Sequence, residues 1–422
     1  MSPDVLLTPG PTPLPPQVRE ALAQPIIHHR TSQYRALFKR ALQGMQAMFQ
    51  TVHPVYCLTS SGTGAMEAAV VNLLSPGDEA VVILGGKFAE RWQELCKASG
   101  IAAATVPVAN GEAADPKAVA AALAAHPKAK VVFATLCETS TGVVHDIQAI
   151  AAAVRQTPAV LVVDAISGLL ADECRTDAWG LDVVVTGSQK GLMLPPGLAF
   201  LSVSPKAQVL VAQAKMPRYY TDLRLYQKAL GDDDTPFTSA VSLVVALEAA
   251  LRIIQEAGGA PGMVQRCARM AQATRAGMAA MGLTLFAKRP SNGVTAVQVP
   301  AGVDGKQLTK VMYDQSRVMV AGGQGEMAGK IFRVAHMGHI GPDDVLAGFR
   351  ALEQALVKLG YAGLAGEGAK AAKATFDQTT PAMGARQSHH LPGAAEGSSS
   401  AASGGSPAER QTGPSGHRRG VE

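Results

Sequence analysis

Cysteine is scarce in this sequence, and its five cysteines lie far apart along the chain. No CxxC pair occurs, and no histidine stands at metal-ligand spacing from any of them; they are Cys57, Cys96, Cys137, Cys174 and Cys267. Zinc and iron-sulfur sites are usually built from closely spaced thiolates, so the sequence predicts no metal site. An odd number of cysteines without a signal peptide is typical of reduced thiols, and we expect a cytoplasmic protein.

Long hydrophobic runs and blocks of like charge are also absent. Apolar runs such as residues 160–163 and 183–185 are far shorter than the roughly 20 residues needed to cross a bilayer. Lysine and arginine are scattered singly and the net charge is only +5, so we expect neither nucleic acid nor a membrane as a partner. With 422 residues, 47% hydrophobic and 17% charged, the chain is typical of a soluble globular protein of two or three domains.

Strands and helices alternate along most of the chain. Residues 1–16 contain the proline-rich run LLTPGPTPLPP, and we expect an extended arm because proline fixes φ and leaves regular structure. Short β-branched runs then alternate with Ala- and Leu-rich helical segments; they are residues 55–59, 80–84, 131–136, 160–164, 182–186 and 199–203. This alternation predicts an α/β domain at residues 17–257, with a mainly parallel sheet that is covered on both faces and binds ligands at the carboxyl ends of its strands.

A change of pattern near residue 258 predicts a second domain. A long helical segment at residues 239–257 is closed by Gly258 and Gly259, and residues 258–363 then mix strands with helices as in a smaller α/β domain. Gly, Ala, Ser, Pro and Gln dominate residues 364–422, with few large apolar side chains. Such a segment buries too little surface to offset its ordering entropy, so we predict a disordered tail.

Two charged residues directly follow buried strands. Lys190 lies in VVVTGSQKGLMLPPG at residues 183–197; in an apolar pocket its pKa would fall, giving the free amine that forms an imine with an aldehyde. The alternative is a lysine that points into solvent at the end of a strand. Asp164 ends the apolar run of LVVDAISG at residues 161–168, where a central parallel strand points its last side chain to the ligand crevice. A helix N-cap is the alternative for Asp164.

A third motif is TSSGTGAMEAAVVNLL at residues 59–74, where a Ser/Gly/Thr turn opens an Ala-rich helix. Free backbone N–H groups and the helix dipole make such a turn a phosphate site, although a glycine-rich turn by itself is a weak signal. In this order, with Lys190 26 positions after Asp164, the three motifs resemble the class V aminotransferases of pyridoxal 5'-phosphate (PLP) fold type I. The likeness is to the alanine-glyoxylate, serine-glyoxylate and serine-pyruvate group, and it extends from the proline-rich arm to about Tyr361.

The resemblance implies a large domain with a mainly parallel seven-stranded sheet, a smaller C-terminal α/β domain, and PLP as cofactor. It implies that Lys190 holds PLP as a Schiff base, while Asp164 pairs with the pyridine nitrogen so that the ring can act as an electron sink. The implied cofactor contacts are Ser61, Gly62, Thr63, Phe88, Thr139, Asp164, Gln189, Lys190 and Thr238.

The resemblance also implies a role for each contact. The turn at residues 61–63 would cradle the phosphate with help from Gln189, and Thr139 of CETSTG would meet the phenolic oxygen. Phe88 of GGKFAERW would stack on the ring where the family more often has tryptophan; a core phenylalanine is the alternative. TPFT at residues 235–238 matches a segment that reaches the phosphate of the neighbouring subunit through Thr238, which implies a homodimer with active sites at the interface.

KIFRVAHMGHI at residues 330–340 matches the strand whose arginine grips the substrate carboxylate in these enzymes. Arg333 supplies the planar, bidentate donor that a carboxylate requires. His336 and His339 follow it but lack a third metal ligand, so we expect loop or interface roles. Arg30, in HHRTSQY at residues 28–34, resembles a His-Arg segment that lies near the substrate in phosphoserine aminotransferases; a structural role at a dimer interface stays open.

The expected activity is a PLP-dependent transamination from serine or alanine to glyoxylate or a similar 2-oxo acid, with the Lys190 amine as general base and acid. One alternative is an aminotransferase for an anionic substrate, phosphoserine or aspartate. A cysteine desulfurase or lyase of the same fold would need a nucleophilic cysteine on a C-terminal loop, whereas the last cysteine, Cys267, has a helical context. A PLP-binding regulatory protein is a further alternative, and a hydrogenase would need a set of iron ligands that the sequence lacks.

Overall fold

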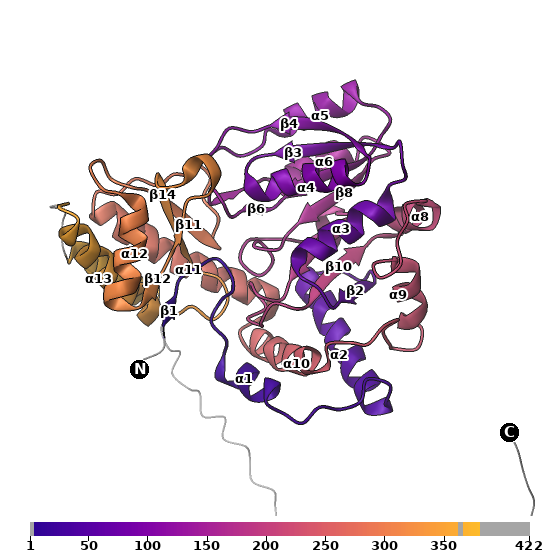
Figure 1. Cartoon of the computed structure of the whole chain (residues 1–422), viewed down its shortest axis with the longest axis horizontal. Coiled ribbons are helices and arrows are strands. Elements are labelled where there is room, and N and C mark those ends of the chain that lie inside the picture. The colour runs from indigo at the N-terminus through magenta and orange to yellow at the C-terminus, as the bar shows by residue number, and fades with distance from the viewer. Residues whose placement is uncertain (1–3, 362–365, 380–422) are drawn as a thin grey trace, which may run out of the picture. The chain divides into compact units, whose positions relative to one another are not determined.

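The computed structural model describes residues 4–361 and 366–379, which belong to one compact unit (Figure 1). This unit contains a seven-stranded sheet and a separate three-stranded sheet. We call residues 16–256, which hold the larger sheet, the large lobe, and we call the described residues from 259 onward the small lobe. In the described part of the chain, no helix combines the length and the apolar character that a membrane span requires.

The sheet of the large lobe runs in the order β2-β10-β9-β8-β5-β3-β4. Strand β10 is antiparallel to β2 and β9, and every other neighbouring pair is parallel. The strands are β2 (Val55–Leu58), β3 (Glu79–Leu84), β4 (Ala102–Pro107), β5 (Ala129–Thr135), β8 (Val160–Asp164), β9 (Val183–Gly187) and β10 (Ala199–Val203). The prediction of a mainly parallel seven-stranded sheet in an α/β fold is therefore confirmed.

Side chains of the central strands alternate between two apolar cores, one on each face of the sheet. In β8, Val160 and Val162 enter one core, while Leu161 and Val163 enter the other. Because both faces are buried, the strand reads as a continuous apolar run. The first core is covered by α3 (Gly62–Leu73), α4 (Lys87–Ala98), α8 (Pro205–Gln213) and α9 (Leu223–Leu230). The second is covered by α1 (Pro16–Leu22), α2 (Ser32–Phe49), α5 (Pro116–Ala125), α6 (Ile147–Val154) and α10 (Val241–Glu256), next to the short α7 (Thr176–Trp179).

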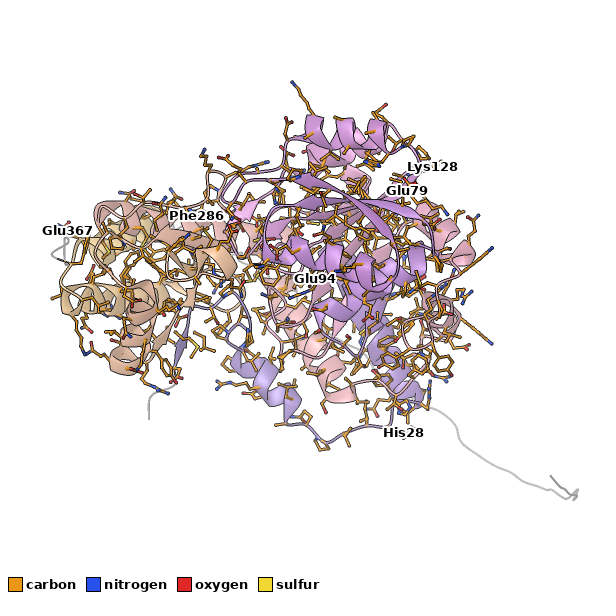
Figure 2. All side chains as sticks on the ribbon, turned by 45° about the horizontal axis from the view of Figure 1, so that its top comes forward. His28, Glu79, Glu94, Lys128, Phe286 and Glu367 are labelled. Carbon is orange, nitrogen blue, oxygen red and sulfur yellow. The ribbon has the colours of Figure 1, made fainter. Side chains whose placement is uncertain are left out.

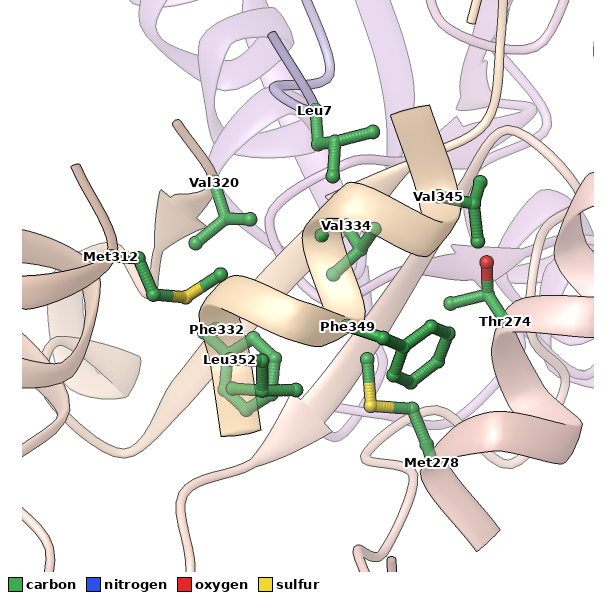
Figure 3. Close-up of a pocket in the computed structure, with 11 residues that line it drawn as sticks. Leu7, Thr274, Met278, Met312, Val320, Phe332, Val334, Val345, Phe349 and Leu352 are labelled. Carbon is green, nitrogen blue, oxygen red and sulfur yellow. The ribbon is translucent and has the colours of Figure 1, made fainter. Parts of the chain in front are cut away.

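The small lobe is built on an antiparallel sheet in the order β11-β14-β13. Its elements are α11 (Gly259–Ala280), β11 (Val294–Gln298), α12 (Gly305–Ser316), β12 (Val318–Met319), β13 (Ala321–Gly322), η1 (Gly325–Met327), β14 (Ile331–Ala335) and α13 (Pro342–Lys358). Strand β1 (Val5–Leu6) of the N-terminal arm pairs in parallel with β12. Leu7, which follows β1, points with Phe332 and Phe349 into the apolar core of this lobe (Figure 3).

The two lobes meet between α11 and β11. Phe286, labelled in Figure 2, lies next to Gly111 of the large lobe. The Lys288 N–H donates to the Gly111 carbonyl at 2.9 Å. Gly258, between α10 and α11, has φ +94°, a conformation that favours glycine. The domain boundary at residues 257 and 258 stays a prediction, and the helix break at Gly258 lies at that point.

The prediction of a disordered tail from residue 364 is wrong for its first part. Residues Glu367–Thr379 form α14, in which Ala372 and Phe376 are buried in the core of the small lobe. These two side chains are four residues apart and therefore share one helix face, which gives this Ala-rich segment enough apolar surface to pack. The rest of the predicted tail, residues 380–422, lies outside the described residues.

Candidate active site

Five strands of the large sheet end at one edge and send their next residues into a single cavity. Strands β2, β3, β5, β8 and β9 share one direction, so their carboxyl ends meet there. The cavity has an empty volume of about 460 Å³. It is lined by Ser61, Gly62, Thr63, Phe88, Arg91, Cys137, Thr139, Asp164, Ile166, Ser167, Gln189 and Lys190. All of the sequence-predicted cofactor contacts except Thr238 line it.

Lys190 is buried in this cavity, with 8% of its surface exposed, so the alternative of a solvent-facing lysine is wrong. Burial is the main cause that lowers the pKa of its amine to about 8, against the attraction of the Asp164 carboxylate. Asp164 is 3% exposed, and burial raises its pKa to about 7. Its Oδ1 accepts a hydrogen bond of 2.8 Å from the Ile166 N–H, which partly offsets the effect of burial.

Unsatisfied hydrogen-bonding groups gather at one end of the cavity. Helix α3 begins there at Gly62, and its N-cap residue Ser61 makes no side-chain capping bond. A Cβ on Gly62 would lie 2.5 Å from the Cδ1 of Ile166, so a side chain at this position would force the Ile166 side chain to move. The Oε1 of Gln189 is buried without a hydrogen-bond partner among the described residues. The end of the cavity therefore presents the N-terminus of α3 to a bound anion, whereas the Gln189 Oε1 can only accept a hydrogen bond.

Arg91 of α4 is a cavity residue that the sequence reasoning missed. Its Nη1 donates to the Thr63 hydroxyl at 3.2 Å, and its Cζ lies 5.3 Å from the centroid of the Phe88 ring. Arg91 therefore joins the turn at the start of α3 to the aromatic side chain of α4. Its spacing of three from Phe88 on a helix is the signal that could have placed it on the same face.

Glu138 is a second residue that the sequence reasoning missed. It lies in β6 (Cys137–Glu138), which pairs with β7 (Val143–Val144), and it is fully buried. Its carboxylate accepts from the N–H groups of Phe88 at 3.2 Å, Ala89 at 3.0 Å and Ser140 at 3.1 Å. It thus fixes the start of α4 against the turn that carries Thr139. The signal was its place inside CETSTG, directly before Thr139.

Arg333 of β14 lies behind Thr139 and is 4% exposed. Its Nη1 donates to the Thr139 carbonyl at 2.8 Å, while its Nε and Nη2 both donate to the Gly322 carbonyl at 3.0 and 2.7 Å. These bonds use three of the five N–H groups that a guanidinium carries. Arg333 is not among the residues that line the cavity, and among the described residues one N–H group on each of its terminal nitrogens has no partner.

The HHRTSQY and TPFT segments lie side by side, and no residue of either segment lines the cavity. Arg30 pairs with Asp234 at 2.9 Å and donates to the Thr235 carbonyl at 2.8 Å. Thr238 is exposed and does not line the cavity. His336 is fully buried, and burial lowers its pKa to about 3. In residues 4–361 and 366–379, no group of three or more His, Cys, Asp and Glu side chains is placed to hold a metal ion.

The chain matches the family described as aminotransferase class-V over residues 5–338. It is 42% identical over 362 residues to the soluble hydrogenase small subunit of a Synechococcus species, covering 85% of this chain and 94% of the relative. It is 36% identical over 386 residues to the L-aspartate–glyoxylate aminotransferase of Paracoccus denitrificans, covering 89% and 97%. The serine–glyoxylate aminotransferase of Arabidopsis thaliana is 32% identical over 391 residues, covering 90% and 97%.

A solved structure is also similar to this chain over most of its length. The pyridoxamine-pyruvate aminotransferase from Mesorhizobium loti superposes with a TM-score of 0.86 and 30% identity, covering 90% of this chain and 98% of that one.

Proposed function

Because the chain belongs to the class V aminotransferase family, whose members depend on PLP, we propose that it transfers an amino group from serine or alanine to glyoxylate. The observation that carries the proposal is the meeting of a buried amine, a buried carboxylate and a helix N-terminus in one cavity. When bound, PLP supplies an aldehyde that reacts with amines and a ring that draws electrons from the substrate Cα. The chain supplies the groups that bind it and move protons.

The cavity residues fit PLP. Its phosphate would bind the N-terminus of α3, with the hydroxyl of Thr63 and the Nε2 of the Gln189 amide as further donors. Asp164 would accept the N–H of the pyridinium, whose positive charge favours the ionised carboxylate and lowers its pKa from the cofactor-free value. Phe88 and Thr139, fixed from behind by Glu138, would contact the ring and the phenolic oxygen.

Lys190 would act as the general base and acid. With a pKa of about 8, a useful fraction of its amine is unprotonated near neutral pH, so it can react with the aldehyde and later take the Cα proton. Arg333 would bind the substrate carboxylate through its two remaining N–H groups and so orient the Cα.

We infer the preference for a small amino donor from the arginines that this chain offers to a substrate carboxylate. Arg333 is the motif-matched receptor for one carboxylate, and Arg91 already contacts Thr63 and Phe88. A distal carboxylate would be buried without an assigned partner, which costs several kcal/mol. A second candidate is an anionic donor, aspartate or phosphoserine, which the L-aspartate–glyoxylate relative favours. Arg30 would bind its distal charge, although Asp234 already pairs with this arginine.

We further propose a homodimer in which TPFT reaches the neighbouring subunit. Phe237 contacts the rings of Tyr219, Tyr220 and the buried Tyr226, and of these Tyr219 is 75% and Tyr220 44% exposed. A large exposed aromatic group of this kind favours a protein interface. In a dimer, Thr238 would contact the phosphate of the partner site. Arg30 would lie near that site as well, because it is bonded to Asp234 and Thr235. A cytoplasmic location stays our expectation from the cysteine pattern.

The deciding experiment is a substrate panel. We would measure kcat/KM for serine, alanine, aspartate and phosphoserine, each with glyoxylate and with 2-oxoglutarate. The proposal expects serine or alanine with glyoxylate to be preferred. A clear preference for aspartate or phosphoserine would overturn the small donor in favour of the second candidate, and Arg30→Ala should then abolish that preference.

A further inference from the structure

The proline-rich N-terminal arm contacts the Lys190 side chain directly. The Lys190 amine donates a hydrogen bond to the carbonyl of Pro9. Pro9 is a buried residue. Thr12 binds the backbone of the same loop: its N–H donates to the Gln189 carbonyl at 3.2 Å, and its hydroxyl donates to the Lys190 carbonyl at 3.1 Å. The arm therefore holds both the backbone and the amine of the lysine.

Gly10 leaves no room for a side chain beside that amine. A Cβ built on Gly10 would lie 2.6 Å from both Cε and Nζ of Lys190 and 2.7 Å from its Cδ. Carbon atoms in contact prefer about 3.5 Å or more, so the end of the lysine would have to move by roughly 1 Å. The end of the Lys190 side chain therefore fills the space that a side chain at position 10 would need.

The arm is anchored in the small lobe just before it reaches Lys190. Leu7 is fully buried in the core of that lobe (Figure 3), and its carbonyl accepts from the Ala335 N–H at 2.8 Å. Ala335 ends β14, two residues after Arg333. The position of Pro9 is therefore set by the same strand that carries the proposed carboxylate receptor.

We propose that Pro9 and Gly10 form a resting place for the Lys190 amine, which orients it as a base while it is not bonded to the cofactor. The inference rests on the proposed transamination. A free lysine side chain has four rotatable bonds, and one fixed acceptor restricts where its lone pair points. The amine takes the Cα proton and becomes an ammonium group, and Pro9 holds one of its N–H bonds. PLP, when bound, would take up the electron pair left at Cα, and the ammonium group would then give its proton to the exocyclic carbon of the cofactor rather than to Cα.

The first test compares Gly10→Ala with Gly77→Ala. Gly77 also has positive φ, +86°, but a Cβ there would meet no atom within 4 Å, so this control carries the backbone strain without the contact. PLP is added to each cofactor-free protein, borohydride traps it at timed intervals, and peptide mapping gives the rate at Lys190 relative to surface lysines. A displacement of about 1 Å in a reacting group can cost about 100-fold, so we expect a loss of that order in Gly10→Ala and wild-type rates in Gly77→Ala.

The second test uses Thr12, in case Gly10→Ala does not fold. Thr12→Val removes the hydroxyl that holds the Lys190 carbonyl and keeps the shape, whereas Thr12→Ser keeps the hydroxyl. We expect kcat to fall by about 5- to 10-fold in Thr12→Val at unchanged PLP affinity, which corresponds to one net hydrogen bond, and to recover in Thr12→Ser.

Equal trapping at Lys190 in Gly10→Ala and wild type would overturn the inference while leaving the transaminase proposal in place. If Gly10→Ala does not fold, equal kcat in Thr12→Val and wild type would overturn it. A wild-type protein that traps no PLP at Lys190 would overturn both proposals.

Discussion

Replacing Arg333 with lysine would separate the charge of the proposed carboxylate site from its shape. Arg333 spends three N–H groups on the carbonyls of Gly322 and Thr139 and keeps one on each terminal nitrogen. Lysine keeps the positive charge but offers a compact ammonium that cannot form a bidentate pair while held by these carbonyls. The substitution should therefore weaken carboxylate binding without changing the net charge.

The size of the effect follows from the bonds that are lost. A hydrogen bond to a charged group is worth about 1.5–3 kcal/mol. Losing one or two of them weakens transition-state binding by about 1.5–6 kcal/mol, or roughly 10- to 25,000-fold in kcat/KM. Part of this loss reflects the reorganised carbonyls of Gly322 and Thr139, so stability has to be measured on the same variant.

The assay compares serine with serinol, which lacks the carboxylate, as amino donors. The wild type should strongly prefer serine, and Arg333→Lys should lose most of that preference while its PLP affinity stays the same. Arg275→Lys is the matched control, because Arg275 also donates to a backbone carbonyl but contacts Ser291 and Thr295, which do not line the cavity, whereas Arg333 contacts Thr139, which does. It should affect stability alone. A kcat/KM for serine within about threefold of wild type in Arg333→Lys would refute the reasoning.

Three further predictions concern the ring-nitrogen partner, a buried histidine and the C-terminal helix. Asp164→Asn should slow single-turnover reaction with an amino acid by orders of magnitude, because an amide does not keep the ring nitrogen protonated; unchanged stopped-flow rates would rule out the role. Burial lowers the pKa of His336 from 6.5 to about 3, so the stability it contributes above pH 6.5 is lost as the pH falls toward 3, by up to about 1.4 kcal/mol per pH unit. The free energy of unfolding should therefore decline less in His336→Gln than in wild type between pH 7 and 5, and parallel urea curves would contradict this. Phe376→Ala should lower the free energy of unfolding by about 3–5 kcal/mol, whereas Lys373→Ala, on the exposed face of the same helix, should change it by less than about 0.5 kcal/mol. Equal melting temperatures for these two variants would show that α14 does not pack.

The central sheet was predictable because its strands are buried on both faces. Runs such as Val160–Asp164 have no polar alternation, are bounded by turn residues, and match the observed strand residue for residue. Strand β4 was missed because it lies at the sheet edge and is largely exposed, and its sequence, AAATVP, is rich in alanine rather than in β-branched residues. Helix α14 was missed because few of its side chains supply the core contact, chiefly Ala372 and Phe376 with the partly buried Ala369, and the overall composition of the segment does not reveal them.

The cavity was predictable wherever one residue type carries one kind of chemistry at a strand end. Lys190 and Asp164 are examples, because a charge directly after an apolar run has few structural explanations. Arg91 and Glu138 were not predictable in this way, since each acts through contacts between segments far apart in sequence. The carboxylate of Glu138 reaches the start of α4, 50 residues earlier, and only the folded chain shows that its negative charge is satisfied by backbone N–H groups.

We propose that Lys190 is the residue that holds PLP, and covalent trapping is the direct test of this assignment. The purified protein would be saturated with PLP, reduced with borohydride, digested and mapped by mass spectrometry, with Lys190→Ala treated in parallel. We expect one stoichiometric label in the wild-type protein, on the peptide that contains Lys190, and no label in Lys190→Ala. A stoichiometric label on any other lysine, or no label in the wild-type protein, would contradict it.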